Sequence, residues 1–152
     1  LNTFVQQSTQ AFNVTVVMGK TAPHIVRIQD FAKQANFPCH VIVNANNMAE
    51  LRANADLAIG AAGSTTWERC CLGLPTLMVV LADNQKSGAL ALAAAHAAYL
   101  IGNVGDIVTQ LPLAVLELID PIYLVRLSHA AALVTNGCGA ELVRDNLRQL
   151  NG

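Results

Sequence analysis

Short apolar runs alternate along the chain with longer segments in which apolar residues recur at helical spacing. The short runs end near Gly, Pro, Asn or Asp, which is typical of buried strands. Strands are therefore predicted at residues 14–18, 39–43, 57–59, 76–81 and 99–101. Helices are predicted at residues 2–12, 24–35, 47–54, 65–72, 87–97, 106–118, 121–134 and 139–150.

Strands separated by helical segments of about ten residues indicate βαβ units, which place parallel strands in one sheet. The right-handed crossovers of such units then predict an α/β fold, a doubly wound and mostly parallel sheet of about five strands flanked by helices. At 152 residues the chain has the length of one domain, which spans residues 1–152. Ligands of this fold bind beyond the carboxyl ends of the strands. Loops expected there contain Lys20 and residues 44–48, 60–66 and 82–86.

Composition removes several classes of function. The formal net charge is -1, and no basic run is present, which argues against nucleic acid as a partner. The apolar run at residues 89–101 is shorter than the roughly twenty residues that span a bilayer, so no membrane span is expected. No signal peptide is visible at the N-terminus, and we expect a cytoplasmic protein. Because the chain begins at Leu1 rather than Met, we expect an upstream segment.

The cysteines and histidines show no arrangement typical of chemistry. Cys39, Cys70, Cys71 and Cys138 lack the spacing of a metal site, which predicts free thiols and no metal. His24, His40, His96 and His129 are scattered in no arrangement typical of catalysis, and a structural role is expected for His40 and His96.

The segment at residues 55–80 has the pattern strand, glycine-lined turn, helix and strand. The glycines at residues 60 and 63 allow another group to approach the backbone closely. Ser64, Thr65 and Thr66 then place hydroxyls beside the unpaired N–H groups of a helix start, where phosphate binds well. An anionic ligand is therefore predicted.

The motif Gly63-Ser-Thr-Thr-Trp-Glu-Arg-Cys-Cys-Leu-Gly-Leu-Pro75, with Ala82-Asp-Asn-Gln85, resembles the C-terminal domain of the PseG family. These are UDP-2,4-diacetamido-2,4,6-trideoxy-β-L-altropyranose hydrolases of pseudaminic acid biosynthesis. The chain is more distantly similar to the Rossmann-like C-terminal domain of MurG-type glycosyltransferases of the GT-B fold. Met48, eight residues before Asp56, and the segment 136–143 extend the resemblance over nearly the whole chain.

The resemblance implies a site for a UDP-sugar. Gly63, Ser64, Thr65 and Thr66 would hold the diphosphate, and Glu68 would accept hydrogen bonds from the ribose hydroxyls. The backbone near Met48 would meet uracil, and Asn84 and Gln85 would face the sugar or the diphosphate. A second interpretation of Glu68 stays open, because Thr65 and Glu68 also have the spacing of a capping box.

The implied function is the UDP-binding half of a hydrolase that releases UDP from a 2,4-diacetamido-2,4,6-trideoxy sugar. The family's catalytic histidine belongs to an N-terminal domain, so this chain is expected to be a fragment with no catalytic residue and no cofactor, inactive without that partner domain. Three alternatives are the donor-binding domain of a GT-B glycosyltransferase, a UDP-sugar 2-epimerase-like domain, and a non-catalytic interaction module.

Overall fold

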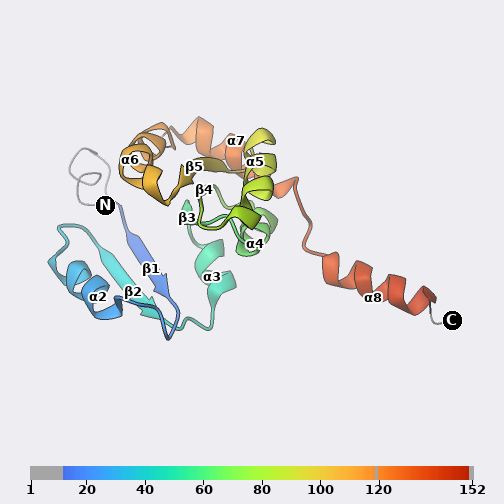
Figure 1. Cartoon of the computed structure of the whole chain (residues 1–152), viewed down its shortest axis with the longest axis horizontal. Coiled ribbons are helices and arrows are strands. Elements are labelled where there is room, and N and C mark those ends of the chain that lie inside the picture. Colours follow the sequence, from blue (N-terminus) through green and yellow to red (C-terminus); the bar gives the residue numbers. More distant parts are fainter. Residues whose placement is uncertain (1–11, 119, 151–152) are drawn as a thin grey trace. The chain divides into compact units, whose positions relative to one another are not determined.

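A computed structural model describes residues 12–118 and 120–150 of the chain (Figure 1). The chain divides into two compact units, Leu1–Glu50 and Leu51–Gly152. All five predicted strands are present, and every neighbouring pair is parallel. The α/β class with parallel strands and flanking helices is thus confirmed. The strands form two hydrogen-bonded sheets of two and three strands rather than one of five. The predicted helix at residues 2–12 lies outside the described residues, apart from Phe12.

The first unit is a βαβ motif. Strand β1 (Val14–Met18) leads through helix α2 (Ile25–Gln34) to strand β2 (Cys39–Val43), and Val14 pairs with Cys39 at the start of the register. The rings of Phe31 and Phe37 meet edge to face, with centroids 6.5 Å apart, and help to hold α2 against the strands. Helix α3 (Met48–Ala53) follows β2.

The second unit contains the three-stranded sheet, in the order β3-β4-β5. Strand β3 is Ala58–Ala61, β4 is Thr76–Val80 and β5 is Tyr99–Asn103. The central strand β4 is buried along nearly its whole length, since a parallel strand inside a sheet is covered on both faces. Its Leu77 and Met78 have no exposed surface and lie at the centre of the unit.

Short connections carry helices between these strands. Helix α4 (Thr65–Cys71) joins β3 to β4, and the 3-10 turn η1 (Asp83–Gln85) with helix α5 (Lys86–Ala94) joins β4 to β5. Gly73 follows the end of α4 and has a left-handed φ of 61°, a conformation common just after a helix. After β5 come η2 (Val104–Asp106), α6 (Ile107–Leu118), α7 (Pro121–Ala132) and α8 (Gly139–Leu150).

The predicted end of α5 is wrong by three residues. The apolar pattern predicts a helix to residue 97, but α5 ends at Ala94, and His96 has a φ of 54°. Ala97 and Ala98 are buried and join the core formed by Cys70, Met78, Ala89, Leu92 and Ala131. Burial in the core, rather than helix periodicity, therefore accounts for the apolar character of residues 97 and 98.

Several predicted absences can be compared with the described part of the chain. There, no single helix is long and apolar enough to cross a membrane. The segments Val104–Leu118 and Pro121–Ala132, inclined to each other by 100°, pass that test of length and composition only as a pair. Within the same residues no cluster of three or more His, Cys, Asp or Glu side chains could hold a metal ion. The four cysteines are free thiols, and neighbouring Cys70 and Cys71 are respectively buried and exposed.

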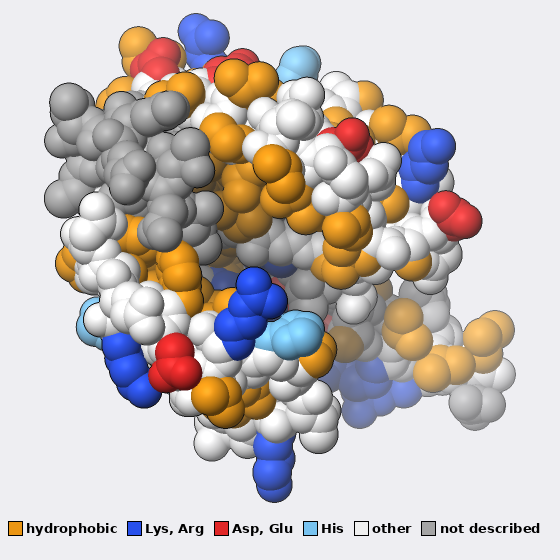
Figure 2. Space-filling view, turned by 60° about the vertical axis from the view of Figure 1, so that its left-hand side comes forward, with side chains coloured by type: hydrophobic (Ala, Val, Ile, Leu, Met, Phe, Trp, Pro, Cys, Tyr) orange, Lys and Arg blue, Asp and Glu red, His pale blue; other side chains and the backbone are white. Residues whose placement is uncertain are grey.

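Charged side chains are sparse on the surface. Figure 2 shows them scattered among hydrophobic side chains, as expected for a sequence in which only 12% of residues are charged. Charged side chains that lie close together are therefore uncommon on this surface.

Candidate functional site

The turn between β3 and α4 is the centre of the candidate site. Hydrogen bonds from Ala58 N to Pro75 O and from Ala62 N to Val79 O tie the two ends of β3 to β4. The chain then leaves the sheet, and the N–H of Thr66 donates to Gly63 O at 2.9 Å to begin the helix. Neither Gly60 nor Gly63 has a positive φ, so the conformation of this turn does not itself require glycine.

Ser64 and Thr65 differ sharply from Thr66. Ser64 is exposed and Thr65 is half-buried, and no side-chain hydrogen bond caps the helix at Ser64. Thr66 is 2% exposed, and its hydroxyl donates to Ala61 O at 3.3 Å. Among the described residues, the hydroxyl and N–H donors without a partner at the helix start are thus those of Ser64 and Thr65, whereas the Thr66 hydroxyl supports the turn from inside.

Gln85 comes from the loop after β4 and meets this turn. Its side-chain carbonyl Oε1 accepts a hydrogen bond from Leu81 N at 3.0 Å. Its Nε2 lies 3.6 Å from the position that a Cβ would take on Gly63. The carboxyl ends of β3 and β4 therefore bring together two predicted site residues, Gly63 and Gln85, with an amide donor facing the turn.

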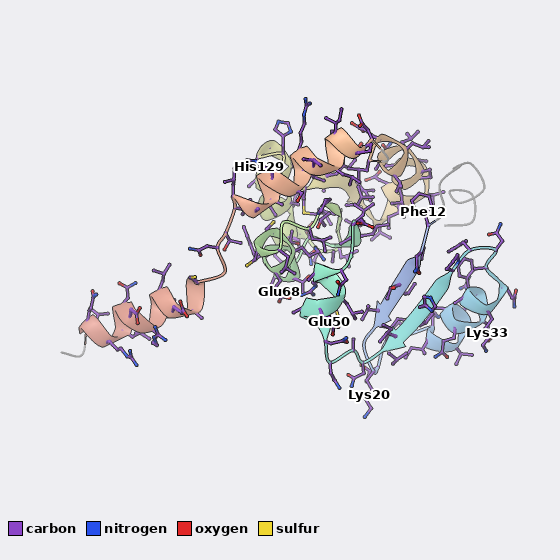
Figure 3. The ribbon with its side chains drawn as sticks, turned by 180° about the vertical axis from the view of Figure 1, so that it is seen from behind. Phe12, Lys20, Lys33, Glu50, Glu68 and His129 are labelled. Carbon is purple, nitrogen blue, oxygen red and sulfur yellow. The ribbon has the colours of Figure 1, made fainter. Side chains whose placement is uncertain are left out.

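Glu68 lies on α4, one turn into the helix, and is exposed (Figure 3). Its Oε2 accepts a hydrogen bond from Nη1 of Arg52 on α3, and the two side chains form an ion pair. The helix begins after Ser64, so the capping box between Thr65 and Glu68 is not formed. The carboxylate is held in place by an arginine and remains accessible to a ligand.

Arg69 is a buried residue that sequence reasoning missed. It is only 6% exposed, yet no carboxylate of the described residues lies within ion-pair distance of its guanidinium. Nη2 donates to Ala61 O and to Thr66 Oγ1, both at 2.8 Å, while the buried Nε has no partner there. Burial, and then the nearby charge of Arg52, lower the pKa of Arg69.

The guanidinium of Arg69 occupies the space that Gly60 leaves free. A Cβ on Gly60 would lie 2.7 Å from Nη1 of Arg69. The predicted close approach at Gly60 is therefore made by a side chain of the same chain. The sequence contains one signal for this contact: a glycine, Gly60, directly follows a predicted apolar strand and is followed nine residues later by Arg69.

The remaining predicted residues are less informative. Asn84 is exposed in η1, and Met48 is half-buried at the start of α3, in the first unit. Lys20, which the sequence places in a loop at the ligand-binding edge, is exposed after β1 (Figure 3). His129, for which no role in the site is predicted, lies on α7 (Figure 3). The surface hollows along α8 and between α2 and β2 contain none of the predicted site residues.

Comparison with known proteins identifies the family of this chain. Residues 2–144 match the family model of the glycosyltransferase family 28 C-terminal domain. The chain belongs to this family. The family 28 chain is also 32% identical over 97 residues to the spore coat polysaccharide biosynthesis protein SpsG of Bacillus subtilis (strain 168). That match covers 63% of this chain and 28% of SpsG.

Two solved structures share the fold. MurG of Acinetobacter baumannii matches with a TM-score of 0.80 and 21% identity, over 95% of this chain and 43% of that one. Glycosyltransferase SsfS6 of Streptomyces sp. SF2575, complexed with thymidine diphosphate, matches with a TM-score of 0.51 and 17% identity, over 82% and 38% of the two chains. The family 28 chain thus spans less than half the length of each of these relatives.

These findings correct the main functional expectation. The matched family is one of glycosyltransferases, and the related solved structures are MurG and a glycosyltransferase. The alternative of a GT-B glycosyltransferase domain is therefore better supported than the hydrolase, and the specific resemblance to the PseG family is not confirmed.

Proposed function

We propose that this family 28 domain binds the nucleotide diphosphate of an activated sugar donor, with UDP as the nucleotide, for a GT-B glycosyltransferase of polysaccharide biosynthesis. The observation that carries the proposal is the β3–α4 turn of a glycosyltransferase-family domain, where Gly63, Ser64 and Gln85 converge. The thymidine diphosphate bound to SsfS6 and the polysaccharide role in the name of SpsG support this direction.

The chemistry of the turn suits a diphosphate. Phosphate oxygens accept hydrogen bonds from N–H and O–H groups, and Ser64 and Thr65 present both kinds of donor at a helix start. The Nε2 group of Gln85 adds a donor from the neighbouring strand end. In this proposal Thr66 contributes by shaping the turn, because its hydroxyl is already engaged with Ala61 and Arg69.

Glu68 has the properties of a ribose acceptor. Its carboxylate is exposed, and Arg52 fixes its orientation through Oε2. A vicinal diol donates two hydrogen bonds, and a carboxylate can accept both. Asn84 and Met48 stay predictions as contacts to the sugar and the base.

The whole transfer reaction is assigned to a larger protein. MurG is more than twice as long as the segment that this chain covers, which leaves room for a second domain to bind the acceptor. We therefore propose that the family 28 domain holds the donor and orients its diphosphate as leaving group. An N-terminal domain would bind the acceptor and provide the catalytic base.

The experiment is calorimetry on the purified chain with UDP, UMP, TDP and uridine. We expect UDP to bind more tightly than UMP, because the turn offers donors to two phosphates. UDP should also bind more tightly than TDP where the domain contacts both uracil and the ribose 2′-hydroxyl. Equal affinity for UDP and UMP would remove the diphosphate site. Binding of none of the four would leave an interaction module as the better hypothesis.

A further inference from the structure

Arg69 is a buried cation without an ion-pair partner among the residues that the structure describes. Three observations define it: the side chain is 6% exposed, its Nε has no partner among the described residues, and no described carboxylate forms an ion pair with it. Burying an unpaired charge costs several kcal/mol unless hydrogen bonds or an opposite charge compensate it. A carbonyl and a hydroxyl give Arg69 only part of that compensation.

Its surroundings make the imbalance larger. Arg52 lies close enough to disfavour the charged form of Arg69. The carboxylate of Glu68, which favours that charged form, is already paired with Arg52. The cluster of Arg52, Glu68 and Arg69 thus carries two positive charges and one negative charge. It lies beside the β3–α4 turn in a chain with a formal net charge of -1.

Each hydrogen bond of Arg69 acts on the turn itself. Ala61 O is the last carbonyl of β3, and Thr66 Oγ1 belongs to the first turn of α4. The Nη2 group of Arg69 therefore links the end of β3 to the start of α4, the two elements that flank residues 62–65. Gly60 makes this possible, since any side chain there would meet Nη1.

We propose that Arg69 is a positioning residue whose buried guanidinium fixes the β3–α4 turn, and that the diphosphate of the donor is the counter-ion that completes its charge balance. This inference rests on the proposed function and adds a residue to it. Arg69 then acts through Ala61 and Thr66 on the geometry, and through its charge on the second phosphate. The affinity gained from the second phosphate should depend on Arg69, whereas the affinity for the nucleoside should not.

The test compares the binding of UDP, UMP and inorganic pyrophosphate to the wild-type chain and to Arg69→Met, Arg69→Lys and Gly60→Ala. We expect Arg69→Met to reduce the ratio of UDP to UMP affinity about tenfold and to weaken pyrophosphate by a similar factor. Arg69→Lys should recover part of the ratio, because the charge remains while the planar donor geometry is lost. Gly60→Ala keeps the charge, displaces the guanidinium and should lower the ratio to a smaller extent.

Arg126→Met is the matched control, because Arg126 is an exposed arginine on α7 without a described partner. It removes the same charge and should leave all three affinities unchanged. The salt dependence of pyrophosphate binding gives a second readout, and its slope should decrease in Arg69→Met but not in Arg126→Met.

The outcomes separate this inference from the proposed function. If the wild-type chain binds UDP and Arg69→Met keeps the wild-type ratio of UDP to UMP affinity, the role of Arg69 is refuted and the donor site stands. If pyrophosphate binds in an Arg69-dependent way but UDP binds no more tightly than pyrophosphate, the anion site stands and the nucleotide function is refuted. If neither UDP nor pyrophosphate binds, both proposals are wrong. If Arg69→Met does not fold, Gly60→Ala and Arg69→Lys decide the question by the same ratio.

Discussion

The contact between Gly60 and Arg69 leads to a quantitative prediction of stability. In Gly60→Ala the new Cβ would lie 2.7 Å from Nη1 and 3.5 Å from Cζ of Arg69. The backbone of Gly60 has an ordinary negative φ, so alanine itself is not strained there. The destabilising part of the effect therefore comes from the collision with the guanidinium.

The size of the effect follows from what holds the guanidinium. A free arginine side chain would move aside at little cost, but this one is buried and donates two hydrogen bonds of 2.8 Å. A shift of a few tenths of an ångström weakens both bonds, and a buried donor that loses its acceptor costs about 1–3 kcal/mol. We expect Gly60→Ala to lower the free energy of unfolding by about 1–3 kcal/mol, within the range for overpacking a core.

A double-mutant cycle tests this reasoning by urea denaturation. In the Arg69→Met background the guanidinium is absent, and Gly60→Ala should cost nothing or stabilise by about 0.5 kcal/mol through the unfolded state. Gly88→Ala is the control, because nothing lies within 4 Å of its Cβ position in α5 and it should stabilise by about 0.5–1 kcal/mol. Additive effects of the two substitutions at residues 60 and 69 would show that the contact has no energetic weight.

Three further predictions concern other parts of the second unit. Gly73→Ala should destabilise by about 1–2 kcal/mol in urea denaturation, because φ is 61° and the Cβ would lie 3.3 Å from Ser128 O. Thiol labelling of the native protein, read by mass spectrometry, should modify exposed Cys71 well before Cys70, whose thiol pKa is raised by burial; urea should remove the difference. Burial, and then the charge and hydrogen bond of Glu117, raise the pKa of Tyr99. The stability that depends on neutral Tyr99 should be complete below the unfolded pKa of about 10 and be lost as the pH rises above it, and Tyr99→Phe should reduce that alkaline loss.

Local signals accounted for most of the secondary structure. Strands β1 and β2 and helix α8 have their predicted bounds, because Gly19, Pro38 and Gly139 mark their ends in the sequence. Gly73 and Pro121 likewise end α4 and begin α7 as the capping rules require. These features depend on residues close in sequence, which is why pattern reasoning could find them.

The electrostatics of the site could not be predicted in the same way. Arg52 and Glu68 are sixteen residues apart, and Arg69 reaches back eight residues to Ala61. The sequence shows Glu68 as either a cap or a ligand contact, and only the packing of α3 near α4 reveals its ion pair with Arg52. The sequence predicts Thr66, like Ser64 and Thr65, as a diphosphate contact, and it does not show that Thr66 is buried, because burial depends on which face of a short helix turns to the sheet.

The charge cluster allows the two roles proposed for the site to be separated with one substitution. Glu68→Gln removes the only negative charge of the cluster, and so raises the local positive potential beside the turn. Inorganic pyrophosphate, which contacts no ribose site, should then bind as tightly as before or more tightly. UDP should bind more weakly by about 1–2 kcal/mol, because the carboxylate acceptor for the ribose hydroxyls is lost. Calorimetry with both ligands distinguishes this from a purely structural role of Glu68. If Arg52 needs its partner to hold the turn, pyrophosphate and UDP should weaken by the same factor, and the assignment of Glu68 to ribose would have to be abandoned.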